Sequence, residues 1–208
     1  MLLAGCPQCA EPIHELESGW ECPAHRAVTP LWRPREALYD AFMDHLARAD
    51  ACPTLLPWPM GPGWQVSDFG VVAAPDRTAM ATMTCCSGMS ELDGAVDVLI
   101  VSEEPGTGLG ARVARLGRSH PAGVGEGAPV ARVRVGRAAV PLWTVSTGED
   151  PDLDRTVLVG EAEGRWLWVV VYPASAALLL RDDWVLCDAA DAGARLVELT
   201  FGGKPPHW

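Results

Sequence analysis

Residues 156–172 read TVLVGEAEGRWLWVVVY, and this segment holds two apolar runs separated by a short polar turn. Runs of this length and composition on either side of Glu163 and Gly164 predict a β-hairpin with strands at 156–162 and 165–172. In the second run both alternating sets of side chains are apolar, which is typical of a strand covered on both faces. We therefore expect this hairpin near the centre of a β-sheet, with Pro173 ending its second strand.

Other segments rich in Val, Ile, Thr or Met surround the hairpin. Between 131 and 135 arginine alternates with valine, the pattern of a half-buried strand. The further predicted strands are 64–73, 78–86, 96–102, 131–135, 142–146 and 196–201. The predicted helices are an amphipathic helix over 35–50, a helical stretch reaching Arg118 and a short helix over 174–180. The fold class predicted is α+β, a mainly antiparallel β-sheet domain with few helices.

The amino end carries two short half-sites, Cys6-Pro-Gln-Cys9 and, twelve residues later, Cys22-Pro-Ala-His25. Each half-site places two ligand side chains on one tight turn, and two such turns can enclose a tetrahedral ion. The spacing is close to that of structural zinc sites, and thiolate and imidazole suit Zn²⁺. We predict a zinc-ribbon-like or knuckle arm in which Cys6, Cys9, Cys22 and His25 hold structural Zn²⁺. Four protein ligands would leave no open position for catalysis.

Alternatives to this zinc site are another metal, no metal, or His14 in place of His25. A disulfide between Cys6 and Cys9 is disfavoured, because no signal for export precedes them. About thirty residues cannot bury enough apolar surface to fold unaided, so metal binding is expected to stabilise the arm. Trp20 is expected to pack in its small core.

Proline and glycine divide the chain into three predicted parts. Residues 1–34 form the arm, 35–63 a helix and a Pro-rich connector, and 64–208 the globular α+β domain. The connector holds Pro57-Trp58-Pro59, and Trp58 and Trp64 either stack on a ligand ring or pack against the sheet.

The composition excludes some classes of function. The 208 residues carry a formal charge of −11, which disfavours binding to nucleic-acid backbones. The longest uncharged apolar run, 166–180, is too short for a membrane span and contains Pro173. Seven cysteines, an odd number, suit a reducing compartment. We predict a cytoplasmic protein.

A glycine-rich loop follows the predicted strand at 96–102. It reads EEPGTGLGA over residues 103–111, and its glycines fit G-x-G-x-x-G/A before a helix. Free amide groups and nearby arginines would attract an anion. The candidate anion-binding residues are Gly106, Gly108, Gly110, Arg112 and Arg115. Glu103 and Glu104 oppose a dinucleotide there, as does the lack of alternating strands and helices.

A nucleophile is conceivable in Cys85-Cys86-Ser87, with His120 as its base. G-x-S-x-G is absent, however, and buried strand thiols are the preferred interpretation.

Several segments together resemble an uncharacterised family of actinobacterial proteins with an N-terminal zinc-ribbon-like arm. They are the two half-sites with Trp20, Pro57-Trp58-Pro59 with Gly63-Trp64, residues 103–111, Pro141-Leu142-Trp143, and Gly160-Glu-Ala-Glu-Gly-Arg-Trp-Leu-Trp168. The resemblance covers most of the chain but implies no established activity. Some members are labelled phosphotransacetylase, for which the only warrant here is the glycine loop and its arginines.

Two functions are therefore predicted. The first is a non-enzymatic cytoplasmic module with structural zinc that binds a protein or a small ligand. The second is an acyl- or phosphoryl-transfer enzyme, with an anionic substrate at Gly106 to Arg115 and Glu103 or Glu104 as acid–base.

Overall fold

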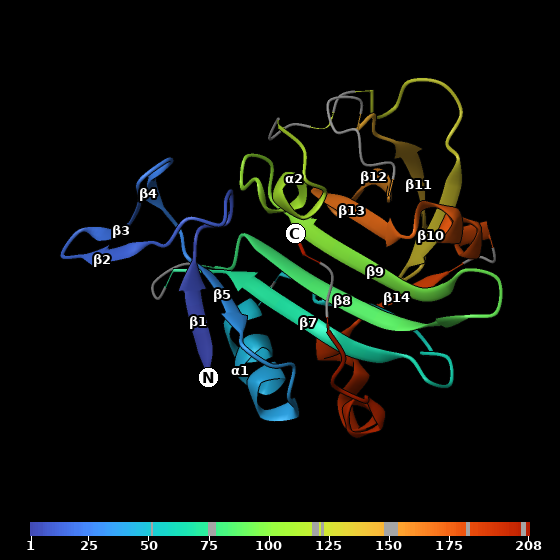
Figure 1. Ribbon diagram of the computed structural model, residues 1–208, viewed down its shortest axis with the longest axis horizontal. Coiled ribbons are helices and arrows are strands. Elements are labelled where there is room, and N and C mark those ends of the chain that lie inside the picture. Colours follow the sequence, from blue (N-terminus) through green and yellow to red (C-terminus); the bar gives the residue numbers. More distant parts are fainter. Residues whose placement is uncertain are drawn as a thin grey trace.

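Figure 1 shows the computed structural model, which describes residues 1–50, 52–74, 78–117, 121, 123–147, 154–181, 184–204 and 207–208. The strands are β1 (Leu2–Gly5), β2 (His14–Leu16), β3 (Gly19–Cys22), β4 (Arg26–Val28), β5 (Leu31–Pro34), β6 (Leu55–Pro57), β7 (Gln65–Val72), β8 (Ala81–Ser90), β9 (Gly94–Glu103), β10 (Ala131–Val135), β11 (Ala138–Thr144), β12 (Thr156–Ala162), β13 (Arg165–Tyr172) and β14 (Val185–Asp188). The helices are α1 (Tyr39–Ala49), α2 (Leu109–Val113) and the 3-10 helices η1 (Ala174–Arg181) and η2 (Ala189–Glu198). Strands dominate, which confirms the predicted fold class.

One sheet of eleven strands forms the body, in the order β1-β5-β7-β8-β9-β13-β12-β11-β10-β14-β6. Its neighbouring strands are antiparallel apart from β10 and β14, which pair in parallel. The β12–β13 hairpin is the one predicted, with Ala162 opposite Arg165 next to the turn. A separate three-stranded sheet, β2-β3-β4, lies at the amino end.

Strand β13 is central, as predicted. It pairs with β12 on one side and with β9 on the other. Trp168 and Val170 enter one hydrophobic core, whereas Leu167 and Val169 enter the core on the opposite face. Burial of each apolar side chain of this size stabilises the folded state by roughly 1.5–3 kcal/mol. This strand therefore contributes a large share of the free energy of folding.

The far half of the sheet curls back over the first half. The hydroxyl groups of Thr82 and Thr84 on β8 donate to the carbonyls of Pro53 and Leu55, at 2.5 and 2.6 Å. Strand β6 therefore lies across the face of β8, although it is the last strand in the sheet order. This fold-back encloses the second core, and Figure 1 shows the curl where β10, β11 and β14 lie.

Helix α1 packs on the same side of the sheet as the curled half. Phe42 contacts Phe69 of β7 edge-on, with 5.0 Å between ring centroids. His45 is fully buried beside them, and its Nε2 lies 2.9 Å from Thr54 Oγ1. Burial lowers the pKa of His45 to about 3, so this imidazole is neutral in the folded protein.

The predicted strand at 196–201 is wrong. Residues through Glu198 belong to η2, whose first turn is capped because the Asp188 carboxylate accepts from the Ala190 amide. Leu196 and Leu199, three residues apart, both reach the core, which suits a helical turn better than alternation. Phe201 forms an isolated β-bridge with Val66, and the Thr200 carbonyl accepts from the Val66 amide at 2.8 Å.

Other boundaries also differ from expectation, as where the helix predicted from residue 35 begins at Tyr39. The helix after the glycine loop, α2, ends at Val113, and Arg118 lies outside the described residues. The connector contains β6. Strands β1 and β5, which both lie within the predicted arm 1–34, pair at the edge of the main sheet, so the arm is from here on the segment 6–30 between them. No helix in the part of the chain that the structure describes combines the length and apolarity needed to cross a membrane.

Candidate metal centre

The four predicted ligands come from two turns at the base of the arm. Cys6 directly follows β1, and Cys9 lies three residues later in the first turn. Cys22 ends β3, and His25 stands in the turn that leads into β4. The β3–β4 pairing places Cys22 opposite Arg26, so this second turn is closed by a ladder.

The ligand atoms gather in one cluster. The Sγ atoms of Cys6 and Cys22 each lie 3.6 Å from Nδ1 of His25, and the Sγ atoms of Cys9 and Cys22 are 3.6 Å apart. All four ligand atoms lie within 4.8 Å of one another. A tetrahedron with zinc–sulfur bonds of about 2.3 Å and zinc–nitrogen bonds of about 2.0 Å has edges of roughly 3.5 to 3.8 Å. The cluster therefore has the dimensions of a metal site.

The thiols are free and their environments differ. A sulfur–sulfur distance of 3.6 Å excludes a disulfide between Cys9 and Cys22, since that bond is about 2.05 Å long. Burial raises the pKa of Cys6 to about 11. Burial also acts to raise the pKa of Cys22, but hydrogen bonds, foremost from the His25 side chain, outweigh it and lower this pKa to about 6. The amide of Gln8 donates to Cys6 Sγ at 3.4 Å, as expected in a knuckle.

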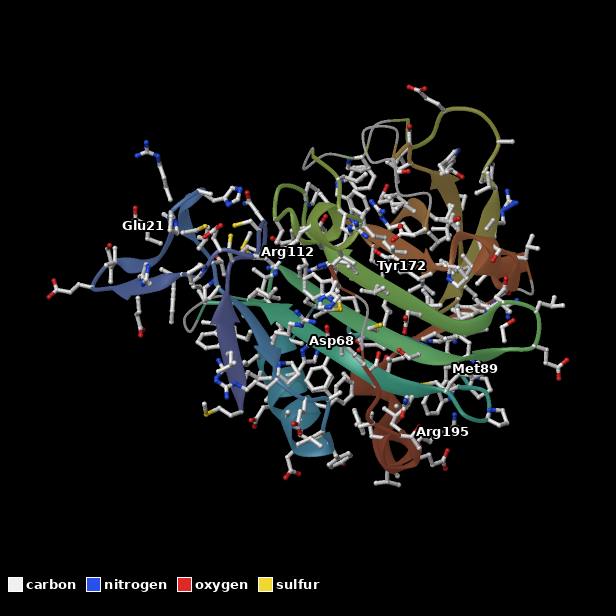
Figure 2. The ribbon with its side chains drawn as sticks, viewed as in Figure 1. Glu21, Asp68, Met89, Arg112, Tyr172 and Arg195 are labelled. Carbon is white, nitrogen blue, oxygen red and sulfur yellow. The ribbon has the colours of Figure 1, made fainter. Side chains whose placement is uncertain are left out.

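The arm is attached to the body on two sides. The Arg112 guanidinium of α2 donates a hydrogen bond to the Cys6 carbonyl. Trp20 of β3 contacts Trp32 of β5 edge-on, with 5.7 Å between ring centroids, and the Trp32 Nε1–H donates to the Ala73 carbonyl. Figure 2 shows the sulfur atoms between the labelled Glu21 and Arg112. The position of the four candidate ligands is therefore coupled to that of α2.

The glycine loop already faces a carboxylate of the protein. Glu103, at the end of β9, is buried and accepts hydrogen bonds from the Gly110 amide at 3.1 Å and from Trp168 Nε1 at 2.7 Å. Burial raises the pKa of Glu103, and these donors act against that effect. A Cβ on Gly110 would lie 2.2 Å from Trp168 Nε1, so glycine is required for the contact. Anion binding by Gly106, Gly108 and Gly110 stays a prediction, in competition with this internal anion.

The two loop arginines also have protein partners. Arg112 contacts the Cys6 carbonyl, and Arg115 forms an ion pair with Asp154 at 3.1 Å. Helix α2 spans only five residues, and its N-cap, Gly108, has a left-handed conformation. The structure thus places the candidate anion residues together but joins them to the arm, to Glu103 and to Asp154.

The other sequence candidates have contacts inside the fold where the structure describes them. Cys85 and Cys86 are buried, and burial raises the pKa of Cys86 to about 12, which disfavours a thiolate nucleophile. Ser87 donates to Asp97, whereas His120 lies outside the described residues. Trp64 packs edge-on against Trp184, with 6.3 Å between ring centroids.

Sequence reasoning missed a group of polar side chains beside the arm. Arg33 Nε donates to Asp68 Oδ2 at 2.8 Å, and Trp208 Nε1 donates to the same oxygen at 3.2 Å. The Trp208 ring also lies against the guanidinium groups of Arg33 and Arg112, at 4.2 and 4.8 Å. The sequence offered one signal for this group, which is a charged residue within each of two apolar segments. Arg33 lies in LWRP of β5 and Asp68, of opposite charge, in VSDFGVV of β7.

Comparison with known proteins gives a family but no activity. No curated protein and no solved structure matches the chain. The model of a family of unknown function, DUF6758, matches residues 3–208. Because this match covers nearly the whole sequence, the chain belongs to the family of unknown function DUF6758.

Proposed function

We propose that Cys6, Cys9, Cys22 and His25 bind one structural Zn²⁺ ion. The observation that carries this proposal is the convergence of four ligand atoms from two turns within 4.8 Å. Three sulfur ligands and one nitrogen ligand favour zinc over calcium or magnesium, which prefer oxygen. Bound metal would keep all three thiols deprotonated, including that of Cys6.

The role of this ion would be structural. Four protein ligands satisfy tetrahedral coordination, so no position remains for water or substrate. Cys6 and Cys22 are buried, which further shields the ion. The hydrogen bond from Arg112 to the Cys6 carbonyl would then fix the position of the ordered arm relative to the body. We infer a non-enzymatic cytoplasmic module in which zinc fixes the arm and the body binds a protein or small ligand.

Metal analysis of the purified protein tests the zinc site. We expect one zinc ion per chain by inductively coupled plasma mass spectrometry, and less than about one-tenth of that in Cys22→Ser, which loses one of four ligands.

Cys187→Ser is the matched control, because Cys187 on β14 is partly exposed and distant in the fold from the cluster. It should retain full zinc. Protein purified without added metal that carries another ion in stoichiometric amount would overturn the assignment to zinc. Unchanged zinc in Cys22→Ser would overturn the site itself.

A further inference from the structure

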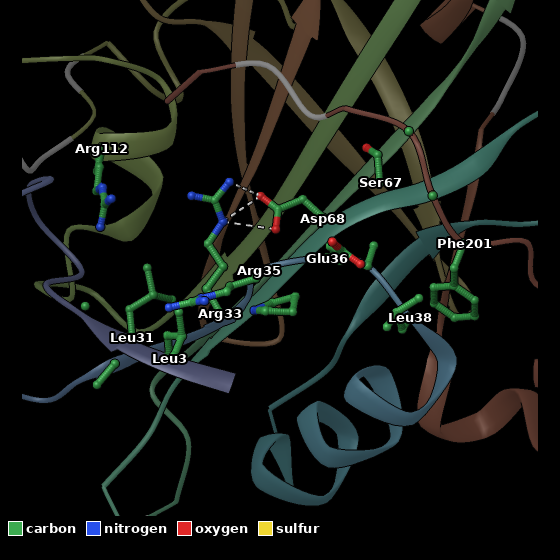
Figure 3. Close-up of a pocket in the computed structure, with 16 residues that line it drawn as sticks. Leu3, Leu31, Arg33, Arg35, Glu36, Leu38, Ser67, Asp68, Arg112 and Phe201 are labelled. Carbon is green, nitrogen blue, oxygen red and sulfur yellow. Dashed lines mark hydrogen bonds and ion pairs between the residues drawn. The ribbon is translucent and has the colours of Figure 1, made fainter. Parts of the chain in front are cut away.

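A cavity of about 720 Å³ lies where the arm meets the body. Its walls come from β1, β5, the segment between β5 and α1, β7, α2 and the segment that follows η2 (Figure 3). This volume falls within the range of pockets that hold small organic molecules. The cavity is on the side of α2 that carries Arg112, away from the amides that Glu103 occupies.

Three guanidinium groups line the cavity, those of Arg33, Arg35 and Arg112. Two carboxylates, Glu36 and Asp68, stand with them. Positive charge is therefore in excess at this place in a chain with a formal charge of −11. Burial lowers the pKa of Arg112, and the charge of Arg33 lowers it further.

The arginines keep unused donors. Asp68 occupies Nε and Nη2 of Arg33, and within the described residues Nη1 of Arg33 makes no hydrogen bond. Arg112 uses Nη1 for the Cys6 carbonyl. Arg35 is exposed and has no ion-pair partner in the same residues. A guanidinium presents five N–H donors in a planar fork that matches carboxylate and phosphate oxygens.

The remaining walls are partly apolar. Leu3, Leu31, Leu38 and Phe201 line the cavity, and Leu38 is 56% exposed. Figure 3 shows Leu38 and Phe201 at one end and Arg112 at the other, with Arg33 and Asp68 between them. Leu3 and Leu31 lie toward Arg33, and Glu36 lies beside Leu38 (Figure 3). A ligand that spans the cavity would meet cationic donors at the Arg112 end and the side chains of Leu38 and Phe201 at the other.

We propose that this cavity binds a small organic anion with a carboxylate or phosphate head group and an apolar body. The head group contacts Arg112 and Arg33, with Arg35 at the rim, and the apolar body lies toward Leu38 and Phe201. The proposal deepens the binding role proposed above, because Arg112 is held by the Cys6 carbonyl next to the metal ligands.

The test uses the full chain and three aryl compounds with one apolar body. Phenylacetate and phenyl phosphate carry the two head groups, and phenylacetamide is the neutral match for phenylacetate. In an NMR titration we expect saturable shifts of the Gly202 and Gly203 amides, which line the cavity, with both anions. Phenylacetamide should bind at least about tenfold more weakly, because charged hydrogen bonds are lost. Binding by one anion alone identifies the head group.

Variants locate the site. Arg112→Gln should weaken anion binding about tenfold. Arg35→Gln, which removes no side-chain hydrogen bond or ion pair to the described residues, should weaken it about two- to fivefold. Arg137→Gln at the exposed β10–β11 turn makes the same charge change and should leave binding unaltered. Equal binding of phenylacetamide, equal weakening by Arg137→Gln, or no saturable shift would each overturn the proposal.

Metal content measured on the same samples separates the two proposals. If the chain carries one zinc ion and shows no saturable shift with either anion, the anion site alone is overturned. A zinc-free chain that binds them overturns the zinc site alone.

Discussion

The arm and the central sheet reach their folded states by different physical means. In β8, β9 and β13 most side chains are buried, and the two faces of these strands contribute to two separate apolar cores. In β2, β3 and β4 most side chains are exposed, and Cys22 is the one residue of these three strands that is buried. The sheet is held by apolar area removed from water. The arm buries too little of it, which fits the proposal that a metal ion held by Cys6, Cys9, Cys22 and His25 stabilises it.

This difference implies different responses to damage. A defect in the sheet removes contacts shared by many strands and should lower the stability of the whole chain. A defect in the arm should stay local, since Arg112 and the Trp20–Trp32 contact are its main attachments.

The largest effect is expected for Trp168→Ala. Trp168 is fully buried and donates to the buried Glu103, so truncation leaves a cavity and a carboxylate without one of its donors. The free energy of unfolding should fall by about 4 kcal/mol in urea titrations followed by circular dichroism. Trp20→Ala in the arm is the matched control, with an expected loss of about 1 kcal/mol. Equal losses would break the contrast between the two regions.

An intermediate effect is expected from acid acting on α1. His45 has a pKa of about 3 in the fold and 6.5 in the unfolded chain. Below pH 6.5 His45 binds a proton in the unfolded state but stays neutral in the folded state. The contribution of neutral His45 to stability is therefore complete above pH 6.5 and is lost as the pH falls toward 3. By pH 5 the loss is about 2 kcal/mol.

Comparison with His45→Gln isolates this contribution, because glutamine does not titrate and can still reach Thr54. The difference in unfolding free energy between the two proteins should shrink by about 2 kcal/mol from pH 7.5 to pH 5. A difference independent of pH would show that His45 is not the group that senses acid.

The smallest global effect is expected on metal removal. Chelation should speed amide hydrogen exchange in β3 and β4 at least about tenfold, while amides of β9 and β13 keep their protection. The global unfolding free energy should change by only about 1 kcal/mol. Should chelation unfold the sheet as well, the arm would have to be regarded as part of the main core.

Much of this arrangement is visible in the sequence because it depends on local patterns. The hairpin at 156–172 is marked by two apolar runs and the Glu163–Gly164 turn, and the ligand cluster by its spacing. Alternation of arginine and valine likewise locates β10. In each case the physical cause acts between residues close in the chain or repeats with the period of the element.

What the sequence does not reveal depends on contacts between distant residues. Thr82 donates to Pro53 because the sheet curls, and no local pattern encodes that curl. Glu103 reads as a charge that opposes an anion site, yet it is the buried acceptor for Trp168, which lies 65 residues away. Trp208 reaches Asp68 across 140 residues. Apolar residues at 196–201 fit a strand until the Asp188 cap is known.

The β1–β5 pairing gives the arm a simple topological origin. Leu2 is opposite Pro34 and Gly5 opposite Leu31, so residues 6–30 are the loop of one antiparallel hairpin at the sheet edge. Lengthening a loop costs only about 0.6 kcal/mol for each doubling of its length. An insertion of this kind can be exchanged or shortened to a tight turn while the edge register persists. The arm is thus a long loop between two paired edge strands, a geometry that would allow it to be grafted onto another hairpin of the same register.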